Sequence, residues 1–236
     1  MPPATETTKE SAPNDRVKRL CVFCGSNTGT RPAYEAAARE LAALMAQAGI
    51  GLVYGGGHSG LMGIVADAAL ANGAEVIGII TEQLTVLERA HSGLTSLQVV
   101  PTMHERKAMM AGLSDGFVAL PGGFGTLEEV CEMITWTQLG IHRKPVALVN
   151  IDGFFDPLLA QFDRALADGL LRIENRREVI SVATPAEALE RIAAWTPPDG
   201  DKWFDPPQPL PARHTANRCD RSPSSTPRVS HWCGAS

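Results

Sequence analysis

Short runs of apolar residues alternate with longer amphipathic segments along most of this 236-residue chain. Runs such as 20–24 and 76–80 are almost wholly apolar, which is typical of strands covered on both faces of a parallel sheet. Segment 32–48 instead repeats its apolar residues with a helical period, and Gly49 follows as a plausible helix stop. The alternation predicts one doubly wound α/β domain, with a mainly parallel, Rossmann-like sheet and helices on both of its faces.

The same patterns locate the elements. The predicted strands are 20–24, 51–54, 76–80, 97–100, 116–120, 145–150 and 179–182. The predicted helices are 32–48, 103–113, 126–141, 155–167 and 185–195, with a further helix from the glycine turn at 55–63 to about Gly73. We expect the domain to span 17–196, between a disordered lead at 1–16 and a disordered, proline-rich tail at 197–236.

Composition and charge exclude several classes of protein. The net charge of −5 argues against a nucleic-acid binder, which usually needs a basic field. No apolar run approaches the ~18 residues of a membrane span, and residues 1–16 lack the apolar core of a secretory signal. These features predict a cytoplasmic protein with no membrane partner.

The cysteines do not form a recognisable framework. Their count of five is odd and their spacing irregular, which argues against a disulfide scaffold. The pair Cys21 and Cys24 has the spacing of a redox or zinc motif, but it lies in a buried strand run without a second pair, so core cysteines are the favoured interpretation. The histidines also lack metal-binding spacing, and the sequence predicts neither a metal nor a cofactor.

A glycine-rich turn at 121–125 follows the strand at 116–120 and precedes an amphipathic helix. This arrangement presents backbone N–H groups to an anion, and we expect a phosphate to bind there. Thr126 and Glu129 have the spacing of a capping box, which alone would explain both residues. The three glycines favour a ligand site, because a plain helix start does not need them.

A second glycine turn, at 55–60, follows the strand at 51–54. It matches Gly-x-Gly-x-x-Gly, but at the second strand-to-helix turn and without an acidic residue at the end of the next strand, so it is not the dinucleotide fingerprint. Ligand contact and tight packing of the loop against the sheet both remain open for it.

Arg106 lies in the middle of the apolar stripe of the helix at 103–113, where a charge is costly unless it is paired. Lys107 flanks the stripe. The alternatives are a side chain that reaches solvent from the end of the stripe, a structural ion pair, or a guanidinium directed at a polar pocket. We favour the polar pocket.

The helix at 126–141 is apolar nearly all round after its first turn. One of its faces can cover the sheet, and the other needs a second partner. That partner is either another element of the same chain or a second copy of the chain, and we favour a homodimer.

Four motifs, taken together, resemble the Lonely Guy family, the cytokinin riboside 5′-monophosphate phosphoribohydrolases, formerly labelled lysine decarboxylases. They are PGGFGTLEE at 121–129, MHERK at 103–107, GGGHSGLMG at 55–63 and TWTQLGIHRKPV at 135–146. The resemblance covers about residues 18–195.

The resemblance implies hydrolysis of the N-glycosidic bond of an N6-modified AMP, giving free base and ribose 5-phosphate, by a dimer or a larger homo-oligomer. It implies that Arg106 and Glu129 form the catalytic pair. The implied substrate contacts are Glu88, Lys107, Gly122, Gly123, Phe124, Gly125, Thr126, Leu127, Glu128 and Thr135.

Two rival functions remain at this stage. A protein that binds a nucleotide or a molybdenum cofactor without hydrolysis could use similar glycine turns. A lysine decarboxylase would need a Schiff-base lysine for pyridoxal phosphate. Lys107 and Lys144 are the only lysines between Arg19 and Lys202, and neither lies in a recognisable pyridoxal context.

Overall fold

A computed structural model describes residues 17–87 and 89–197. The predicted lead at 1–16, nearly all of the predicted tail, Cys219, Cys233 and Glu88 therefore lie outside the described residues. The strands are β1 (Arg19–Phe23), β2 (Gly51–Tyr54), β3 (Val76–Thr81), β4 (Ser96–Val100), β5 (Gly116–Ala119), β6 (Val146–Val149) and β7 (Val179–Val182). The helices are α1 (Pro32–Gln47), α2 (Gly60–Ala71), α3 (Glu82–Leu87), α4 (Met103–Leu113), α5 (Phe124–Gln138), η2 (Ile151–Gly153), α6 (Asp156–Ala167), α7 (Ile173–Arg177) and α8 (Pro185–Ala194).

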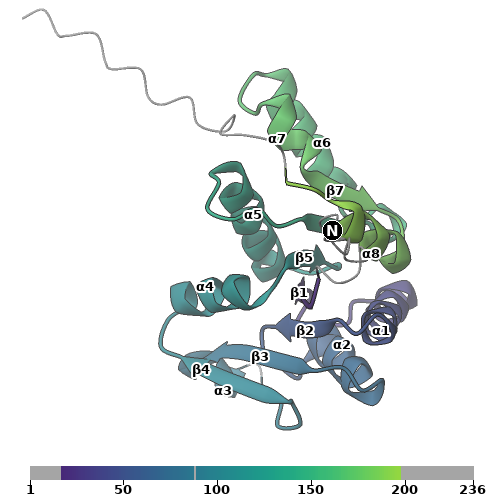
Figure 1. The fold of residues 1–236 in the computed structure, drawn as a ribbon, viewed down its shortest axis with the longest axis vertical. Helices are drawn as coiled ribbons and strands as arrows, with labels where there is room; N and C mark the ends of the chain where they lie inside the picture. Colours follow the sequence, from purple (N-terminus) through teal and green to yellow (C-terminus); the bar gives the residue numbers. More distant parts are fainter. Residues whose placement is uncertain (1–16, 88, 198–236) are drawn as a thin grey trace, which may run out of the picture. The chain divides into compact units, whose positions relative to one another are not determined.

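The seven strands form one parallel sheet in the order β4-β3-β2-β1-β5-β6-β7 (Figure 1). The chain winds outward from β1 to β4 and then returns to place β5 on the other side of β1. This reversal between β1 and β5 is the switch point at which doubly wound sheets bind ligands, beyond the carboxyl ends of the strands. The predicted fold class is confirmed.

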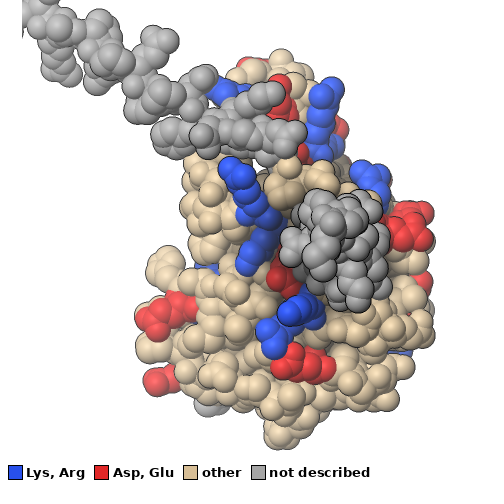
Figure 2. Space-filling model, in the orientation of Figure 1, with Lys and Arg blue, Asp and Glu red and all other residues tan. Residues whose placement is uncertain are grey.

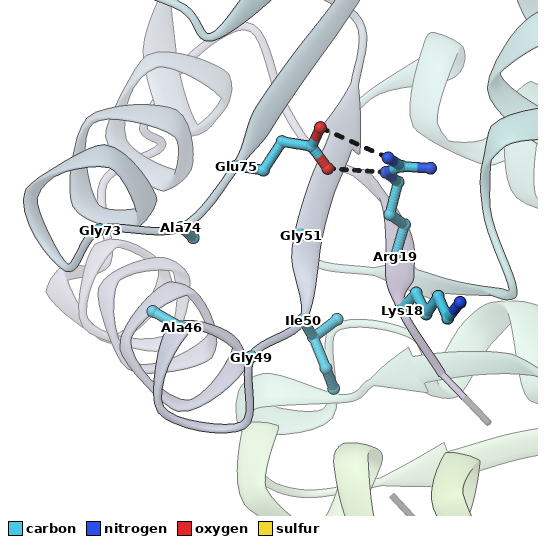
Figure 3. Close-up of a pocket in the computed structure, with 9 residues that line it drawn as sticks. All are labelled: Lys18, Arg19, Ala46, Gly49, Ile50, Gly51, Gly73, Ala74 and Glu75. Atoms are coloured by element: carbon cyan, nitrogen blue, oxygen red, sulfur yellow. Dashed lines mark hydrogen bonds and ion pairs between the residues drawn. The ribbon is translucent and has the colours of Figure 1, made fainter. Parts of the chain in front are cut away.

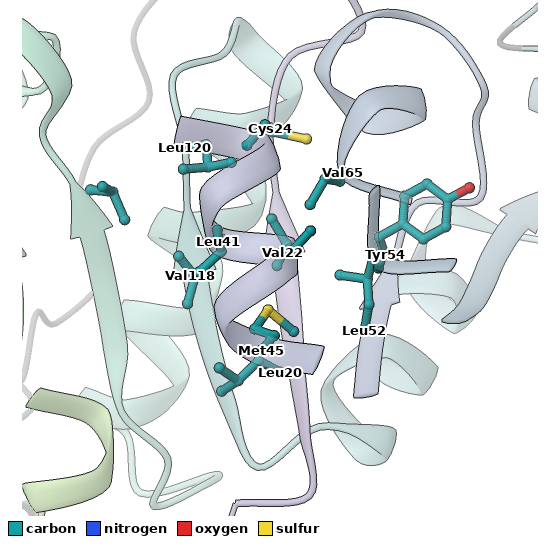
Figure 4. Packing of buried hydrophobic residues seen from close by; sticks show 14 of the residues in the cluster. Leu20, Val22, Cys24, Leu41, Met45, Leu52, Tyr54, Val65, Val118 and Leu120 are labelled. Atoms are coloured by element: carbon teal, nitrogen blue, oxygen red, sulfur yellow. The ribbon is translucent and has the colours of Figure 1, made fainter. Parts of the chain in front are cut away.

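Alternating side chains of the strands supply two separate cores. Leu20 and Val22 pack with α1, α2 and α8 on one face, where Leu41 of α1 is fully buried (Figure 4). Cys21 and Phe23 point to the other face and pack with α4, α5 and α6. Successive residues of a strand face opposite sides, so the continuous apolar run fills both layers. Cys21 and Cys24 are buried free thiols, and the expectation of core cysteines is confirmed.

The helix boundaries show where sequence patterns were incomplete. The sequence patterns predicted neither α3 nor α7. Thr102 caps α4, because its hydroxyl accepts the Glu105 N–H and donates to the Glu105 carboxylate. The first bond is the N-cap bond of a capping box, whereas the second joins the two side chains instead of returning to the Thr102 backbone N–H. The spacing Thr102–Glu105 could have predicted it.

No helix in the described part of the chain combines the length and the apolar character needed to cross a membrane. On the face shown in Figure 2, basic and acidic side chains lie near one another and most of the surface belongs to other residues. That face therefore shows no broad field of one sign. The cytoplasmic location stays a prediction.

His142, just after α5, is a partly buried histidine that packs beside Phe117 and Trp136. Neither of its ring nitrogens has a hydrogen-bond partner among the described residues. Burial, and secondarily the charge of Lys144, lowers the pKa of His142 from 6.5 to about 4. The folded protein therefore holds the neutral ring at pH values where the unfolded chain would bind a proton.

We predict that replacing His142 with phenylalanine flattens the dependence of stability on pH. Because the pKa is lower in the folded state, the stability that His142 contributes is present above pH 6.5 and is lost as the pH falls toward 4. The loss is at most about 3 kcal/mol. Urea unfolding at several pH values would measure it, with the exposed His104→Gln as the matched control. Equal slopes for wild type and His142→Phe would contradict the prediction.

Candidate active site

Arg106 is buried on the inner side of α4 with only 5% of its surface exposed. Its Nε donates to the Ile79 carbonyl at 3.0 Å, its Nη2 to the Gly55 carbonyl at 3.3 Å, and its Nη1 to Glu129 Oε1 at 3.1 Å. A buried guanidinium is costly unless its charge and its N–H groups are satisfied. These three acceptors come from β3, the turn after β2 and α5. A side chain that reaches solvent is excluded, and Arg106 forms an ion pair, one of the alternatives that the sequence left open. The favoured polar pocket at Arg106 stays a prediction.

Gly55 is required by the approach of Arg106. A Cβ built on Gly55 would lie 2.1 Å from Arg106 Nη2, far closer than non-bonded atoms allow. The glycine turn at 55–60 therefore has a packing role that the sequence left open, and its packing partner is the candidate catalytic arginine.

Glu129 lies on α5 with 9% of its surface exposed and faces Arg106 across the carboxyl edge of the sheet. The capping-box interpretation of Thr126 and Glu129 is wrong. Helix α5 begins at Phe124, its N-cap is Gly123 without a side-chain cap, and Thr126 lies inside the first turn. Glu129 therefore does not take part in a capping box, and its carboxylate forms the ion pair with Arg106.

The turn before α5 is held against the turn after β1. Gly25 N–H donates to the Pro121 carbonyl at 3.1 Å. A Cβ on Gly122 would lie 2.1 Å from Thr126 Oγ1 and 2.8 Å from the Gly25 nitrogen. Only glycine permits this contact at the switch point between β1 and β5.

The first turn of α5 leaves backbone donors for a ligand. Leu127 N–H bonds back to the Gly123 carbonyl at 3.1 Å, whereas the N–H groups of Phe124, Gly125 and Thr126 precede any intrahelical acceptor. They lie about one helical turn before Glu129. The Phe124 side chain is 93% exposed at this position.

Lys107 faces α5 rather than the sheet. Its ammonium pairs with the carboxylate of Glu128 and lies 3.1 Å from Glu132 Oε2. Burial acts to lower the pKa of Lys107, but hydrogen bonds and charge from the two carboxylates outweigh it and raise the pKa. Lys107 is therefore a charged residue whose charge is already balanced in this structure.

The remaining residues predicted to contact the substrate differ in exposure and in distance from the Arg106–Glu129 pair. Gly123, Gly125 and Glu128 are exposed near the turn, and Gly122 and Leu127 are half-buried. Thr135 is exposed about 9 Å further along α5 than Glu129. Its hydroxyl donates to the Cys131 carbonyl at 2.7 Å. One copy of the chain does not bring Thr135 to the Arg106–Glu129 pair.

Two surface hollows differ in their relation to this site. One, of about 350 Å³, lies at the amino ends of β1, β2 and β3, where Arg19 and Glu75 form an ion pair of 2.7 Å (Figure 3). That is the edge opposite the switch-point loops. The other, of about 570 Å³, lies at the carboxyl edge between 26–28, 58–60 and 89–92. The second hollow adjoins the loops of the candidate site.

One cluster was missed by sequence reasoning. His58, Asp67 and His91 bring their ring nitrogens and carboxylate within 4.8 Å of one another. Their spacing along the chain matches no metal motif, so only the fold reveals them. No sequence pattern could indicate that the Ile79 carbonyl accepts a hydrogen bond from Arg106, because a residue of any type has a backbone carbonyl.

The site is therefore a buried arginine–carboxylate pair beside the start of α5, whose first N–H groups have no intrahelical acceptor, at the switch point of a Rossmann-like sheet. Comparison with known proteins identifies its family. The family described as "Possible lysine decarboxylase" matches residues 62–192. Cytokinin riboside 5′-monophosphate phosphoribohydrolase LOG of Oryza sativa subsp. japonica is 47% identical over 182 residues, covering 77% of this chain and 75% of the relative. The enzyme of the same name from Arabidopsis thaliana, LOG7, is 44% identical, covering 77% of this chain and 84% of the relative.

The chain belongs to the cytokinin riboside 5′-monophosphate phosphoribohydrolase family. Among solved structures, the molybdenum cofactor binding protein from Rippkaea orientalis is similar, with a TM-score of 0.56 over 74% of this chain and 95% of that protein. Its sequence identity is 24%, so this likeness establishes a shared fold.

Proposed function

We propose that this protein hydrolyses the N-glycosidic bond of N6-modified AMP, a cytokinin riboside 5′-monophosphate, to free base and ribose 5-phosphate. Family membership supports the activity and the substrate class. The observation that carries the proposal is the buried pair of Arg106 and Glu129, 3.1 Å apart, beside the N-terminus of α5. Plain AMP is a second substrate to be compared.

In the proposed mechanism Glu129 acts on the anomeric carbon of the ribose. Cleavage of a glycosidic bond builds positive charge on the sugar, and a fixed carboxylate stabilises that charge or directs a water molecule to it. Arg106 is held by two carbonyls and in turn holds Glu129 Oε1. Its main part is therefore to orient the carboxylate, because three of its N–H groups are already engaged.

The phosphate is proposed to bind the backbone N–H groups of Phe124, Gly125 and Thr126, which also lie at the positive end of the helix dipole. Lys107 and Glu128 flank this position as an ion pair. We propose that they, with Gly122, Gly123 and Leu127, contact the nucleotide. The contacts of Glu88 and Thr135 rest on the family resemblance alone.

The rival function is binding of a nucleotide or molybdenum cofactor without hydrolysis. The likeness to a molybdenum cofactor binding protein concerns the fold. A carrier has no need for a carboxylate held by a buried arginine, whereas hydrolysis does. The placement of Glu129 therefore favours the enzyme.

We predict that Glu129→Gln and Arg106→Ala each lower kcat for release of base from isopentenyl-AMP by a hundredfold or more, the scale of one positioned electrostatic group. Glutamine keeps the shape of Glu129 but not its charge. Chromatographic detection of free base gives the rate, and circular dichroism checks folding. The matched control is Glu105→Gln, because Glu105 is exposed beside Arg106 and pairs with Thr102. A near wild-type rate for Glu129→Gln would remove Glu129 from the mechanism.

We also propose a homodimer through the apolar face of the 126–141 segment, with larger assemblies built from it. Leu139 is 51% exposed and Ile141 is 61% exposed, while Ile134 and Trp136 are half-buried. Exposed apolar groups gathered at one helix support association. An interface there would also cover Thr135 and bring the two copies' α5 helices together.

We predict that the double change Leu139→Asp and Ile141→Asp converts the dimer to a monomer. Carboxylates buried in an apolar interface would be desolvated without partners, which opposes association. Light scattering coupled to gel filtration measures the mass. Leu170→Asp is the control, since Leu170 is 84% exposed but lies after α6. A monomeric wild type, or a double variant that remains dimeric, would contradict the proposal.

A further inference from the structure

Residues 89–93 lie alongside the glycine turn that holds Arg106. His58 N–H donates to the Arg89 carbonyl at 3.0 Å, and His91 N–H donates to the Gly56 carbonyl at 3.0 Å. Gly57 and Ala90 form an antiparallel bridge between these bonds. The turn after β2 is thus paired, residue by residue, with a segment that follows β3 and α3.

His91 joins this segment to α2. Its ring is 5% exposed, its Nδ1 accepts the Gly93 N–H at 3.0 Å, and its Nε2 lies 3.0 Å from Asp67 Oδ1. An Nδ1 that accepts a hydrogen bond carries no proton, so the proton is on Nε2 and is donated to Asp67. The His58 ring stacks on His91 at 4.3 Å between centroids. One buried ring therefore binds α2, the segment 89–93 and the turn after β2.

This cluster is a hydrogen-bonding site rather than a metal site. The two rings are nearly parallel, at 11°, so their nitrogen lone pairs do not converge on one ion. Metal binding at His91 Nε2 would also require its proton to move to Nδ1, where the Gly93 N–H already points. The geometry instead matches a carboxylate that orients an imidazole.

The connection to the candidate site runs through two successive peptides, Gly55–Gly56 and Gly56–Gly57. The backbone N–H of His91 donates to the Gly56 carbonyl, and the carbonyl of the preceding Gly55 accepts from Arg106 Nη2. A Cβ on Gly56 would lie 3.2 Å from Ile80 and 3.1 Å from Leu97, so the turn has little freedom to move toward the sheet. Arg89 has a φ of 54°, a left-handed conformation that costs a non-glycine residue about 1 kcal/mol. The surrounding bonds hold it there.

We propose that His91, oriented by Asp67, is a positioning residue that acts through the Gly55–Gly56 turn on Arg106 and hence on Glu129. The proposal rests on the proposed hydrolysis and extends it to residues outside the reacting pair. The bonds of the His91 ring to Asp67 and to the Gly93 N–H fix the segment 89–93, and the backbone N–H of His91 in that segment holds the turn, with no proton transferred.

Steady-state kinetics with isopentenyl-AMP test this role. We expect His91→Ala and Asp67→Ala to lower kcat about tenfold or more, with KM changed little, because a displaced Arg106 weakens an interaction used in the transition state. Asp67→Asn should restore most of kcat, since the amide oxygen still accepts from Nε2. Asp67 is exposed, so its variants test the proposal even if His91→Ala does not fold. Variants that lower the melting temperature but leave kcat unchanged would overturn it.

A double-mutant cycle with Arg106→Ala distinguishes a relay from an independent effect. If His91 acts through Arg106, His91→Ala should lower kcat little further in the Arg106→Ala background. A full additional tenfold loss in that background would overturn the relay. Micromolar binding of Zn²⁺ that His91→Ala abolishes would overturn the hydrogen-bonding assignment.

Amide hydrogen exchange separates this proposal from the proposed function. In His91→Ala we expect faster exchange at the amides of His58 and residue 91, with β6 as an unchanged internal control. This result needs no activity. Wild-type protein that releases no base would refute the proposed function alone, whereas unchanged exchange at the turn would refute the positioning role.

Discussion

The buried ion pair between Arg106 and Glu129 is the interaction around which the carboxyl edge of this sheet is built. A guanidinium that is 5% exposed must have its charge and N–H groups satisfied, and this one takes acceptors from β3, the turn after β2 and α5. Removing one partner from a buried pair commonly costs ~3–5 kcal/mol. The pair therefore binds three elements together, and the same constraint holds a carboxylate in one orientation.

The topology explains why these elements meet. In the order β4-β3-β2-β1-β5-β6-β7, the loops after β1 and β5 become neighbours at the switch point, and the loop after β2 lies beside them. Glycines at 25, 55 and 122 allow backbone and side chains to approach where a Cβ would collide. The start of α5 then offers N–H groups for an anion on one side, while Glu129 lies further along the same helix. The proposed anchor for phosphate and the proposed carboxylate for the sugar thus share one helix.

Much of this arrangement follows from the sequence, because it depends on period and composition. Apolar runs located every strand, and the position of Arg106 in an apolar stripe indicated a buried charge. Three features did not follow. The start of α5 was misplaced because Thr126 and Glu129 imitate a capping box, while Gly123 provides the N-cap. The carbonyls of Gly55 and Ile79 have no side-chain signal. His58, Asp67 and His91 meet only once α2 and the segment after α3 are folded together.

The central claim is that this site cleaves a nucleoside 5′-monophosphate at its glycosidic bond. The most direct measurement incubates the purified full-length protein separately with isopentenyl-AMP, AMP, the matching nucleoside and lysine, and follows release of base and of CO₂. The account predicts free base and ribose 5-phosphate from the monophosphate, little release from the nucleoside, which lacks the phosphate anchor, and no CO₂ from lysine. Absence of base from every nucleotide, or equal release from nucleoside and monophosphate, would contradict it.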